Sequence, residues 1–270
     1  MKIGVRAHDY GKRGIEELAC LLHGEGYDGA QLALPKAFKE IDSYQDIRLS
    51  HIERIRRAFE ENQVEIPVMG CYMDLGNPDD EARQYAVKTI KTCLNYGKEM
   101  GAGVVGTETA YAHLNKGERA AWRPYMMDSL KRVMEEAQRI DMKLAIEPVY
   151  WHPLTDLETT LEVIRMVDDP EHLRLIFDAS NLLEYPESTD QDTYWSQWLE
   201  GIGAYIHVMH IKDYSLGKDR AYQPEQLGEG ILRYKEISRW LHENRPDMYL
   251  LREEMNPAAA RKDIEFMKRL

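Results

Sequence analysis

The feature that most constrains the fold of this chain is a strand-then-helix pattern that recurs eight times from one end to the other. We predict strands over residues 2–6, 27–34, 65–72, 103–109, 143–149, 173–178, 204–212 and 248–253. Each predicted strand is followed by a segment in which apolar residues recur at helical spacing. Strands that alternate with helices form a parallel sheet, because each helix carries the chain back to the start of the next strand.

Eight such units fill the 270 residues with no linker or low-complexity segment left over. That is the size of a closed (β/α)8 barrel, which typically takes ~250 residues. An open, doubly wound sheet is the alternative, but the segment after the first strand, His8–Gly14, lacks a glycine-rich phosphate fingerprint. We therefore predict an α/β protein, a single (β/α)8 TIM barrel with parallel strands, with residues 1–270 as one domain.

The clearest predicted helix runs from Asn77-Pro78-Asp79, which has the composition of a helix start, to Gly101, which can end it. Two further helices are expected over residues 232–241 and 257–270. The longest stretches without a regular pattern are residues 111–123 and 214–230. On the active face of a barrel, loops of this length usually shape the binding pocket.

Composition indicates a globular protein and argues against one class of partner. Hydrophobic residues make up 43% and charged residues 30%, and no apolar run approaches the ~20 residues that cross a bilayer. The formal net charge of -12 argues against a nucleic-acid partner, since phosphate binding draws on clustered Lys and Arg. Three scattered cysteines and a first strand in place of a signal peptide favour the cytoplasm. The oligomeric state is left open, and a homo-oligomer is possible.

Four polar residues stand where late strands end. Glu147 follows a strand that is apolar on both faces, and Pro148 stops its pairing. Asp178, His210 and Glu253 close the three strands after it. The carboxyl ends of barrel strands meet at one mouth, so these side chains are expected to converge. Carboxylates with one imidazole suit a single divalent metal ion, Mn²⁺, Mg²⁺, Co²⁺ or Zn²⁺.

Strand alternation decides which neighbouring side chains face the same way. His210 shares its face with Val208 and Lys212, whereas His207 points to the other face. Lys212 is thus placed to reach a substrate. At the last strand either Glu253 or Glu254 can face inward, because a shift of one residue exchanges them.

Other strand ends supply candidate pocket walls. Glu108 is the strongest, since a glutamate in an otherwise small and buried strand needs a partner. Aromatic faces suit the C–H face of a sugar ring, and His or Glu suits hydroxyls. The further candidates are His8, Tyr72, Trp151 and His152.

Several of these segments resemble one known family. The run His207–Asp213, followed by Leu227-Gly228-Glu229-Gly230, is similar to a signature of the xylose isomerase-like TIM barrels. That superfamily includes sugar-phosphate isomerases and epimerases, ketose 3-epimerases, inosose isomerases and dehydratases, and endonuclease IV. Further similar segments are Gly106–Thr109, Ala145–Pro148, Ile176–Asp178 and Leu250–Glu253.

The resemblance implies one divalent cation held by Glu147, Asp178, His210 and Glu253. It also implies that Glu147 and Glu253 act as an acid/base pair, moving a proton at a carbon next to a carbonyl through an enediolate. Asn181 stands where many relatives carry a second histidine, and it can hydrogen-bond a substrate hydroxyl.

We therefore expect a metal-dependent sugar or polyol isomerase or epimerase. The alternatives are an inosose-type dehydratase, an endonuclease IV-like hydrolase and a non-catalytic binding member. The last two are ranked lower. For the hydrolase the reason is that the histidines of a trinuclear zinc cluster are missing, since Tyr72 and Glu108 stand at two of the strand ends concerned. No Arg/Lys cluster for a phosphate stands out, which favours an unphosphorylated substrate.

Overall fold

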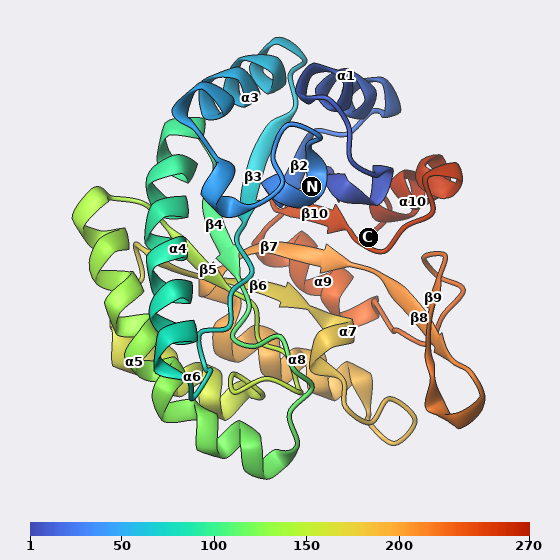
Figure 1. Ribbon diagram of the computed structural model, residues 1–270. Helices are drawn as coiled ribbons and strands as arrows, with labels where there is room; N and C mark the ends of the chain where they lie inside the picture. The colour runs from blue at the N-terminus through green and yellow to red at the C-terminus, as the bar shows by residue number, and fades with distance from the viewer.

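The computed structural model describes residues 1–270 and contains a closed barrel of eight parallel strands (Figure 1). Around the barrel the strands follow the order β1-β10-β7-β6-β5-β4-β3-β2. Their bounds are β1 Lys2–Arg6, β2 Gly29–Leu32, β3 Glu65–Gly70, β4 Val104–Thr107, β5 Leu144–Ile146, β6 Leu173–Asp178, β7 Ile206–Ile211 and β10 Tyr249–Arg252. The predicted (β/α)8 architecture is confirmed, and every predicted strand has its counterpart.

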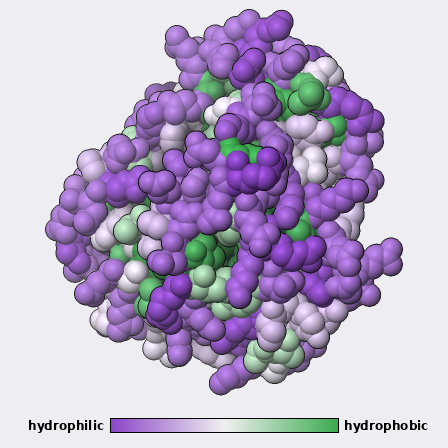
Figure 2. All heavy atoms as spheres, turned by 90° about the vertical axis from the view of Figure 1, so that its left-hand side faces the viewer, coloured by the Kyte–Doolittle hydropathy of each residue, from purple (hydrophilic) through white to green (hydrophobic).

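Helices surround the barrel and bury its outer face (Figure 1). The longer ones are α1 Ile15–Glu25, α3 Leu49–Glu61, α4 Asp80–Met100, α5 Lys116–Ile140, α6 Leu157–Val167, α8 Gln191–Ile202, α9 Lys235–Asn244 and α10 Ala260–Met267. Two single-turn helices, α2 Leu34–Ala37 and α7 Ala179–Leu182, follow β2 and β6. None of these helices is long and apolar enough to span a bilayer. The face that carries α4 and α5 is mainly hydrophilic, with hydrophobic atoms only in separate patches (Figure 2).

The barrel interior is closed by one compact layer of apolar side chains. It consists of Val68, Val104, Ala145, Ile176, Val208 and Leu251. Because side chains alternate along a strand, the residue two positions further on points the same way, one step nearer the mouth. That next position is Glu147 after Ala145 and His210 after Val208. The apolar layer is thus the floor on which the polar strand ends stand.

The ends of α4 show how local sequence sets the elements. Asp79 Oδ1 accepts a hydrogen bond from the backbone N–H of Ala82 and so caps the helix at its start. Gly101 ends it with a φ of +78°, a left-handed conformation that glycine adopts without strain. The predicted start and end of this helix are confirmed.

Two predicted irregular stretches contain regular structure. Residues 111–123 were expected to be a loop, but α5 already begins at Lys116, where Asn115 Oδ1 caps the N–H groups of Gly117 and Glu118. Residues 214–230 contain most of an antiparallel hairpin, β8 Asp213–Leu216 and β9 Tyr222–Glu225. This hairpin extends from the right-hand side of the barrel in Figure 1.

Other element bounds differ from the expected ones by a few residues. The segment expected as a helix over residues 232–241 is α9, three residues further on, and residues 257–270 contain a short 3-10 turn before α10. The ladder of β5 ends at Ile146 and that of β10 at Arg252. Glu147 and Glu253 therefore stand just beyond their strands rather than as the last residues within them.

Asp213 anchors the loop after the hairpin. Its carboxylate accepts backbone N–H groups from Gly228 and Gly230 at 3.0 Å and from Leu232 at 3.1 Å. A Cβ on Gly230 would collide with this carboxylate. The Lys-Asp and Gly-Glu-Gly segments of the sequence are thus two halves of one local structure, which fixes the chain beyond β7.

Candidate metal centre and active site

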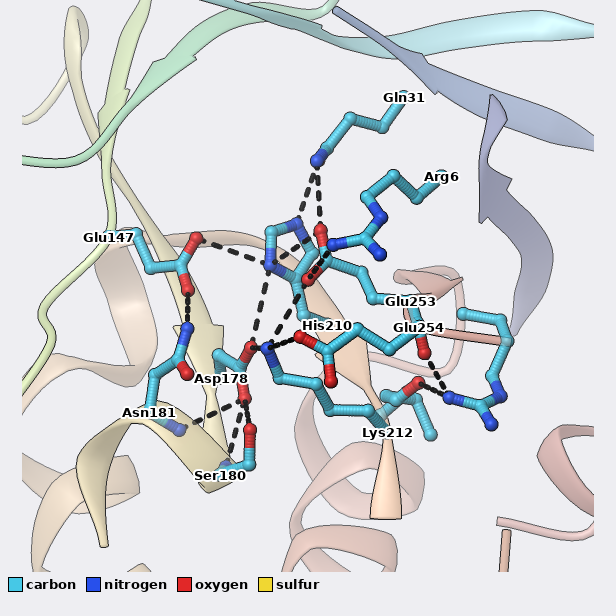
Figure 3. Close-up of polar contacts among 12 residues, drawn as sticks. Arg6, Gln31, Glu147, Asp178, Ser180, Asn181, His210, Lys212, Glu253 and Glu254 are labelled. Carbon is cyan, nitrogen blue, oxygen red and sulfur yellow. Dashed lines mark hydrogen bonds and ion pairs between the residues drawn. The ribbon is translucent and has the colours of Figure 1, made fainter. Parts of the chain in front are cut away.

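Four polar side chains from four strands meet at the mouth of the barrel (Figure 3). Glu147, Asp178 and His210 offer ligand atoms that all lie within 4.8 Å of one another. Asp178 and His210 are partners in the β6–β7 register, so the sheet itself places them side by side. The predicted convergence of these side chains is therefore present in the structure.

His210 lies at the centre of this group. Its Nδ1 atom is 3.3 Å from Glu147 Oε2, 3.5 Å from Glu253 Oε1 and 3.8 Å from Asp178 Oδ2. Figure 3 shows the carboxylates of Glu147 and Glu253 on either side of the imidazole ring. All four side chains are almost completely buried. Glu253 thus belongs to the cluster through His210.

Gln31 of β2 fixes the orientation of the imidazole. Its amide nitrogen donates to Glu253 Oε1 at 3.0 Å, so its Oε1 must face His210 Nε2, which lies 2.7 Å away. This oxygen can only accept, and the Nε2 atom therefore carries a proton. Sequence reasoning missed Gln31, although a glutamine inside a fully buried four-residue strand was a signal for it.

The cluster has the polar atoms that a cation would need. Nδ1 of His210 is buried and takes part in no hydrogen bond, and Oδ2 of Asp178 is buried with only the ammonium of Lys212 beside it, at 2.9 Å. A buried ring nitrogen without a hydrogen bond is rare, and a bound ion is one of the few explanations for it. The other oxygen of Asp178 is already used by Ser180, from its N–H at 2.9 Å and its hydroxyl at 2.8 Å. The donor set therefore fits a divalent cation.

Two neighbouring residues hold the carboxylates in place. Asn181 Nδ2 donates to Glu147 Oε1 at 2.6 Å, which leaves Oε2 toward His210. Lys212 Nζ lies 2.9 Å from Asp178 Oδ2 and 3.5 Å from Glu253 Oε2. Both residues were predicted as substrate-binding side chains, and the structure places both at the edge of the cluster.

The last strand turns Glu253 and Glu254 to different surroundings. Glu253 contacts His210 and Gln31, as described above. Glu254 has a φ of +54° and accepts a hydrogen bond from the Tyr222 hydroxyl in the hairpin. Its Oε1 also lies 3.6 Å from Lys212 Nζ. Of the two registers left open by the sequence, the structure places Glu253 against His210.

Charges in this cluster are strongly coupled. Burial alone would lower the pKa of His210, but the carboxylates of Glu253 and Glu147 outweigh it and raise the pKa to about 9. Burial would raise the pKa of Glu253, but His210 and Arg6 outweigh it and hold the pKa well below its ordinary value. With no cation bound, the carboxylates draw a proton onto His210; a divalent cation would replace that charge.

A cavity of about 710 Å³ opens above the cluster. Its walls include all seven residues predicted to bind substrate: His8, Tyr72, Glu108, Trp151, His152, Asn181 and Lys212. Sequence reasoning missed Arg6, Tyr44 and the rim aromatics Tyr111, Tyr150 and Tyr222, which come from loops and the hairpin. Arg6 pairs with Asp9 at 2.7 Å and lies 3.6 Å from Glu253.

Glu108 lies on the wall of this cavity without a cationic partner. Its Oε2 is 3.6 Å from Nδ1 of His152, which has no hydrogen-bond partner. Burial, together with the charge of Glu147, raises the pKa of Glu108 to about 8. Burial lowers the pKa of His152 to about 3. With no cation bound, Glu108 is thus inclined to hold its proton and His152 to be neutral, which suits the pair to hydroxyl groups.

A second cavity of about 680 Å³ lies at the other end of the barrel, among Lys2, Glu65 and Tyr249 at the amino ends of the strands. His207 lines it, so this histidine faces away from the cluster as its position in the strand predicts. None of the predicted site residues borders this cavity.

Comparison with known proteins agrees with this architecture. A family model described as xylose isomerase-like TIM barrel matches residues 21–270. No curated protein matches the chain. Among solved structures, 3-keto-D-glucoside 4-epimerase from E. coli is 19% identical over 100% of both chains, with a TM-score of 0.77.

Two further solved structures are similar. A D-tagatose 3-epimerase-like protein is 18% identical, covers 99% of this chain and 96% of its own, and has a TM-score of 0.79. A barrel protein from Mycobacterium smegmatis in complex with magnesium is 16% identical, with 98% and 95% covered and a TM-score of 0.73. At these identities the likeness establishes the fold alone.

Proposed function

Because this chain belongs to the xylose isomerase-like TIM barrel family, we propose that it is a divalent-metal-dependent isomerase or epimerase of a sugar or polyol. The reaction would move a proton at a carbon next to a carbonyl. The observation that carries the proposal is the convergence of Glu147, Asp178 and Glu253 on the unpartnered Nδ1 of His210.

The cation would be held by Glu147, Asp178, His210 and Glu253. Three carboxylates and one imidazole suit Mn²⁺, Mg²⁺, Co²⁺ or Zn²⁺, and the missing thiolates disfavour a structural zinc. When bound, a divalent cation polarises the substrate carbonyl, which makes the neighbouring C–H more acidic and stabilises the negative charge that develops. A magnesium complex is known for the similar protein from Mycobacterium smegmatis.

Glu147 and Glu253 are proposed as the acid/base pair. Their carboxylates lie on either side of His210, so they would approach a substrate above it from different directions (Figure 3). One carboxylate takes the proton from the carbon, and the other, in its protonated form, returns a proton to the opposite face or to the adjoining carbon. The substrate and product then have the same composition. Asn181 would keep Glu147 aligned through its 2.6 Å hydrogen bond.

The remaining cavity residues would position the substrate. Glu108 and His152 offer hydrogen-bonding groups for hydroxyls, and Lys212 offers a cation beside Asp178. His8 and Tyr72 line the cavity from beyond the ends of β1 and β3. The similar structures are named as a 3-keto-D-glucoside 4-epimerase and a D-tagatose 3-epimerase-like protein, so keto-sugars are the first substrates to test.

Solvent proton exchange is the test of this proposal. The protein would be loaded with Mn²⁺ or Co²⁺ and incubated in D₂O with ketoses, inososes and 3-keto-glucosides. We expect deuterium at the carbon next to the carbonyl of at least one of them, detected by NMR, and a product of unchanged composition in H₂O. Chelated protein and Glu147→Gln are the matched controls and should show little exchange.

Other outcomes would assign a different reaction. A product lighter by one water would indicate a dehydratase on the same scaffold. Cleavage of a duplex at an abasic site would indicate the hydrolase instead. Absence of exchange, with neither a bound metal nor a thermal shift with any of these ions, would leave the binding member as the remaining candidate.

A further inference from the structure

The cavity above the metal centre has two parts of different chemistry. Its floor is polar, with Glu253, Lys212 and Asn181 at the edge of the cluster. Its outer part is lined by Tyr111, His113, Tyr150 and Trp151, which we call the aromatic wall. The volume of about 710 Å³ lies within the range of about 300–1,000 Å³ that sites for drug-sized ligands have. A single sugar ring seated on the floor fills only part of it.

Trp151 and His113 form the centre of the aromatic wall. Their rings are parallel within 4°, with centroids 4.6 Å apart. Tyr150 packs its edge against Trp151 at 4.5 Å and 88°. The loop that carries His113 is tied to this segment, because the N–H of Leu114 donates to the carbonyl of Trp151 at 3.1 Å. The rings are thus held in fixed planes before any ligand arrives.

Tyr111 extends the aromatic wall outward and leaves much of its ring exposed to solvent. It is 62% exposed, yet its hydroxyl donates to the carbonyl of Tyr72 at 2.9 Å, which holds the ring at the cavity. Tyr222, 44% exposed, is held in the same way by Glu254. Aromatic carbon that is exposed, fixed and grouped at a cavity mouth marks a ligand-binding surface.

Two arginines near the aromatic wall are already engaged, and Lys36, which lines the same cavity without an ion pair, lies over the ring of Tyr72 rather than among the four wall residues. Arg119 donates to the carbonyl of Tyr150 and to Thr155, and Arg220 pairs with Glu187 at 2.8 Å. Neither guanidinium is left for a phosphate or carboxylate. The chemistry of the wall therefore matches a neutral ring that presents C–H or aromatic faces.

We propose that the aromatic wall is a second binding subsite, which takes a neutral ring attached to the reacting sugar, so that the substrate is a glycoside rather than a free monosaccharide. This inference rests on the proposed function, which places the reacting sugar at the metal centre. The attached ring is a second sugar or an aryl group, both of which stack on aromatic side chains.

Isothermal titration calorimetry on the metal-loaded full-length protein tests the subsite. The ligands are methyl β-D-glucoside, phenyl β-D-glucoside and cellobiose, which share one sugar and differ in the attached group. We expect the Kd of phenyl glucoside or cellobiose to be about tenfold lower than that of the methyl glucoside, as expected for one added ring in a stacking site. Whichever ring gains affinity identifies the chemistry of the attached group.

Variants locate the gain. In His113→Ala and Trp151→Ala, the Kd of the larger glycoside should come within about twofold of that of methyl glucoside. Trp151→Phe keeps an aromatic ring and should keep most of the gain in affinity. Tyr185→Ala is the matched control, since Tyr185 is 58% exposed but does not line the cavity, and it should leave the gain in affinity unchanged. Circular dichroism checks that each variant is folded.

Equal Kd values for the three ligands, or no measurable binding of any of them, would overturn the subsite. The titration requires no turnover, so its result is separable from the proposed reaction. A protein that prefers the larger glycosides but never exchanges a proton would refute the reaction and keep the subsite. Proton exchange by a protein that binds all three glycosides equally would support the reaction and refute the subsite.

Discussion

The Oε1 atom of Gln31 lies 2.7 Å from Nε2 of His210 and fixes which nitrogen of the imidazole faces the carboxylates. The same amide donates to Glu253, so one side chain orients two members of the cluster. Groups that orient metal ligands contribute to affinity without touching the ion.

We therefore expect Gln31→Leu to weaken Mn²⁺ binding by about 10- to 100-fold, the usual loss for such a partner. Titration calorimetry on metal-stripped protein measures it. Gln45→Leu, at an exposed position away from the cavity, is the control. An unchanged Kd in Gln31→Leu would show that the imidazole is oriented by other contacts.

Glu147→Gln and Glu253→Gln should each lower kcat by about 10² to 10⁴, because proton transfer by a positioned side chain contributes that much. The amide keeps the size of the side chain, so the melting temperature should change little. Glu254→Gln is the control, since Glu254 binds Tyr222 rather than His210. If Glu254→Gln were the inactive variant, the assignment at the end of β10 would be reversed.

Glu108 provides a test of hydroxyl recognition. Its neighbour His152 is neutral, and no cation pairs with it, so an amide can replace the carboxyl as a hydrogen-bonding group. We expect Glu108→Gln to keep kcat/KM within a few-fold and Glu108→Ala to lower it by roughly 10- to 100-fold, the loss of one or two buried hydrogen bonds. Steady-state kinetics decide. A loss in Glu108→Gln as large as in Glu108→Ala would instead assign the carboxyl a proton-transfer role.

The Asp213 anchor makes a prediction about stability. Asp213→Ala leaves four backbone N–H groups, those of Tyr214, Gly228, Gly230 and Leu232, without their acceptor, which should cost about 3 kcal/mol or more of unfolding free energy. Gly230→Ala should also destabilise, because its Cβ would collide with that carboxylate. Urea denaturation measures both, with Lys218→Ala at the exposed hairpin turn as the control. A small effect of Asp213→Ala would mean that these N–H groups find other hydrogen-bond acceptors.

His207 should make the fold sensitive to acid. Burial, with the nearby charges of Lys143 and Arg174, lowers the pKa of His207 to about 4. The unfolded chain, with a pKa of about 6.5, then binds more protons between pH 6.5 and 4, so stability falls as the pH falls through that window.

His207→Gln should remove this contribution, which amounts to up to about 3 kcal/mol at the acid end. Urea unfolding of both proteins at pH 7 and pH 4.5 gives the difference, and His23→Gln at an exposed position is the control. A parallel loss of stability in wild type and His207→Gln would contradict the assignment.

Much of this architecture was predictable because alternation along buried strands carries it. Ala145 and Val208 are interior residues, and the same period puts Glu147 and His210 at the mouth. The repeat of eight units then favoured a barrel over an open sheet, and closure brings distant strand ends together. The family resemblance supplied the expected roles of Glu147 and Glu253, which remain predictions.

Other features depend on contacts that no periodicity encodes. Gln31 stands in a strand of only four residues and acts through partners far away in the chain. The hairpin of β8 and β9 contains Pro224 and a turn with positive φ at Asp219 and Arg220, so its pattern does not resemble a strand pair. The aromatic wall arises where two loops meet, and the sequence alone does not pair His113 with Trp151.

The apolar floor of the barrel also limits how this molecule can change. Deleting one residue between Ala145 and Glu147 would turn the carboxylate outward among the helices while the barrel still closed. The same holds between Ile176 and Asp178. Insertions or deletions inside these strands would therefore abolish the metal centre, whereas those beyond the strand ends would leave it intact. New substrate preferences can thus arise by remodelling the loops around Trp151 and the hairpin while the spacing within the strands stays fixed.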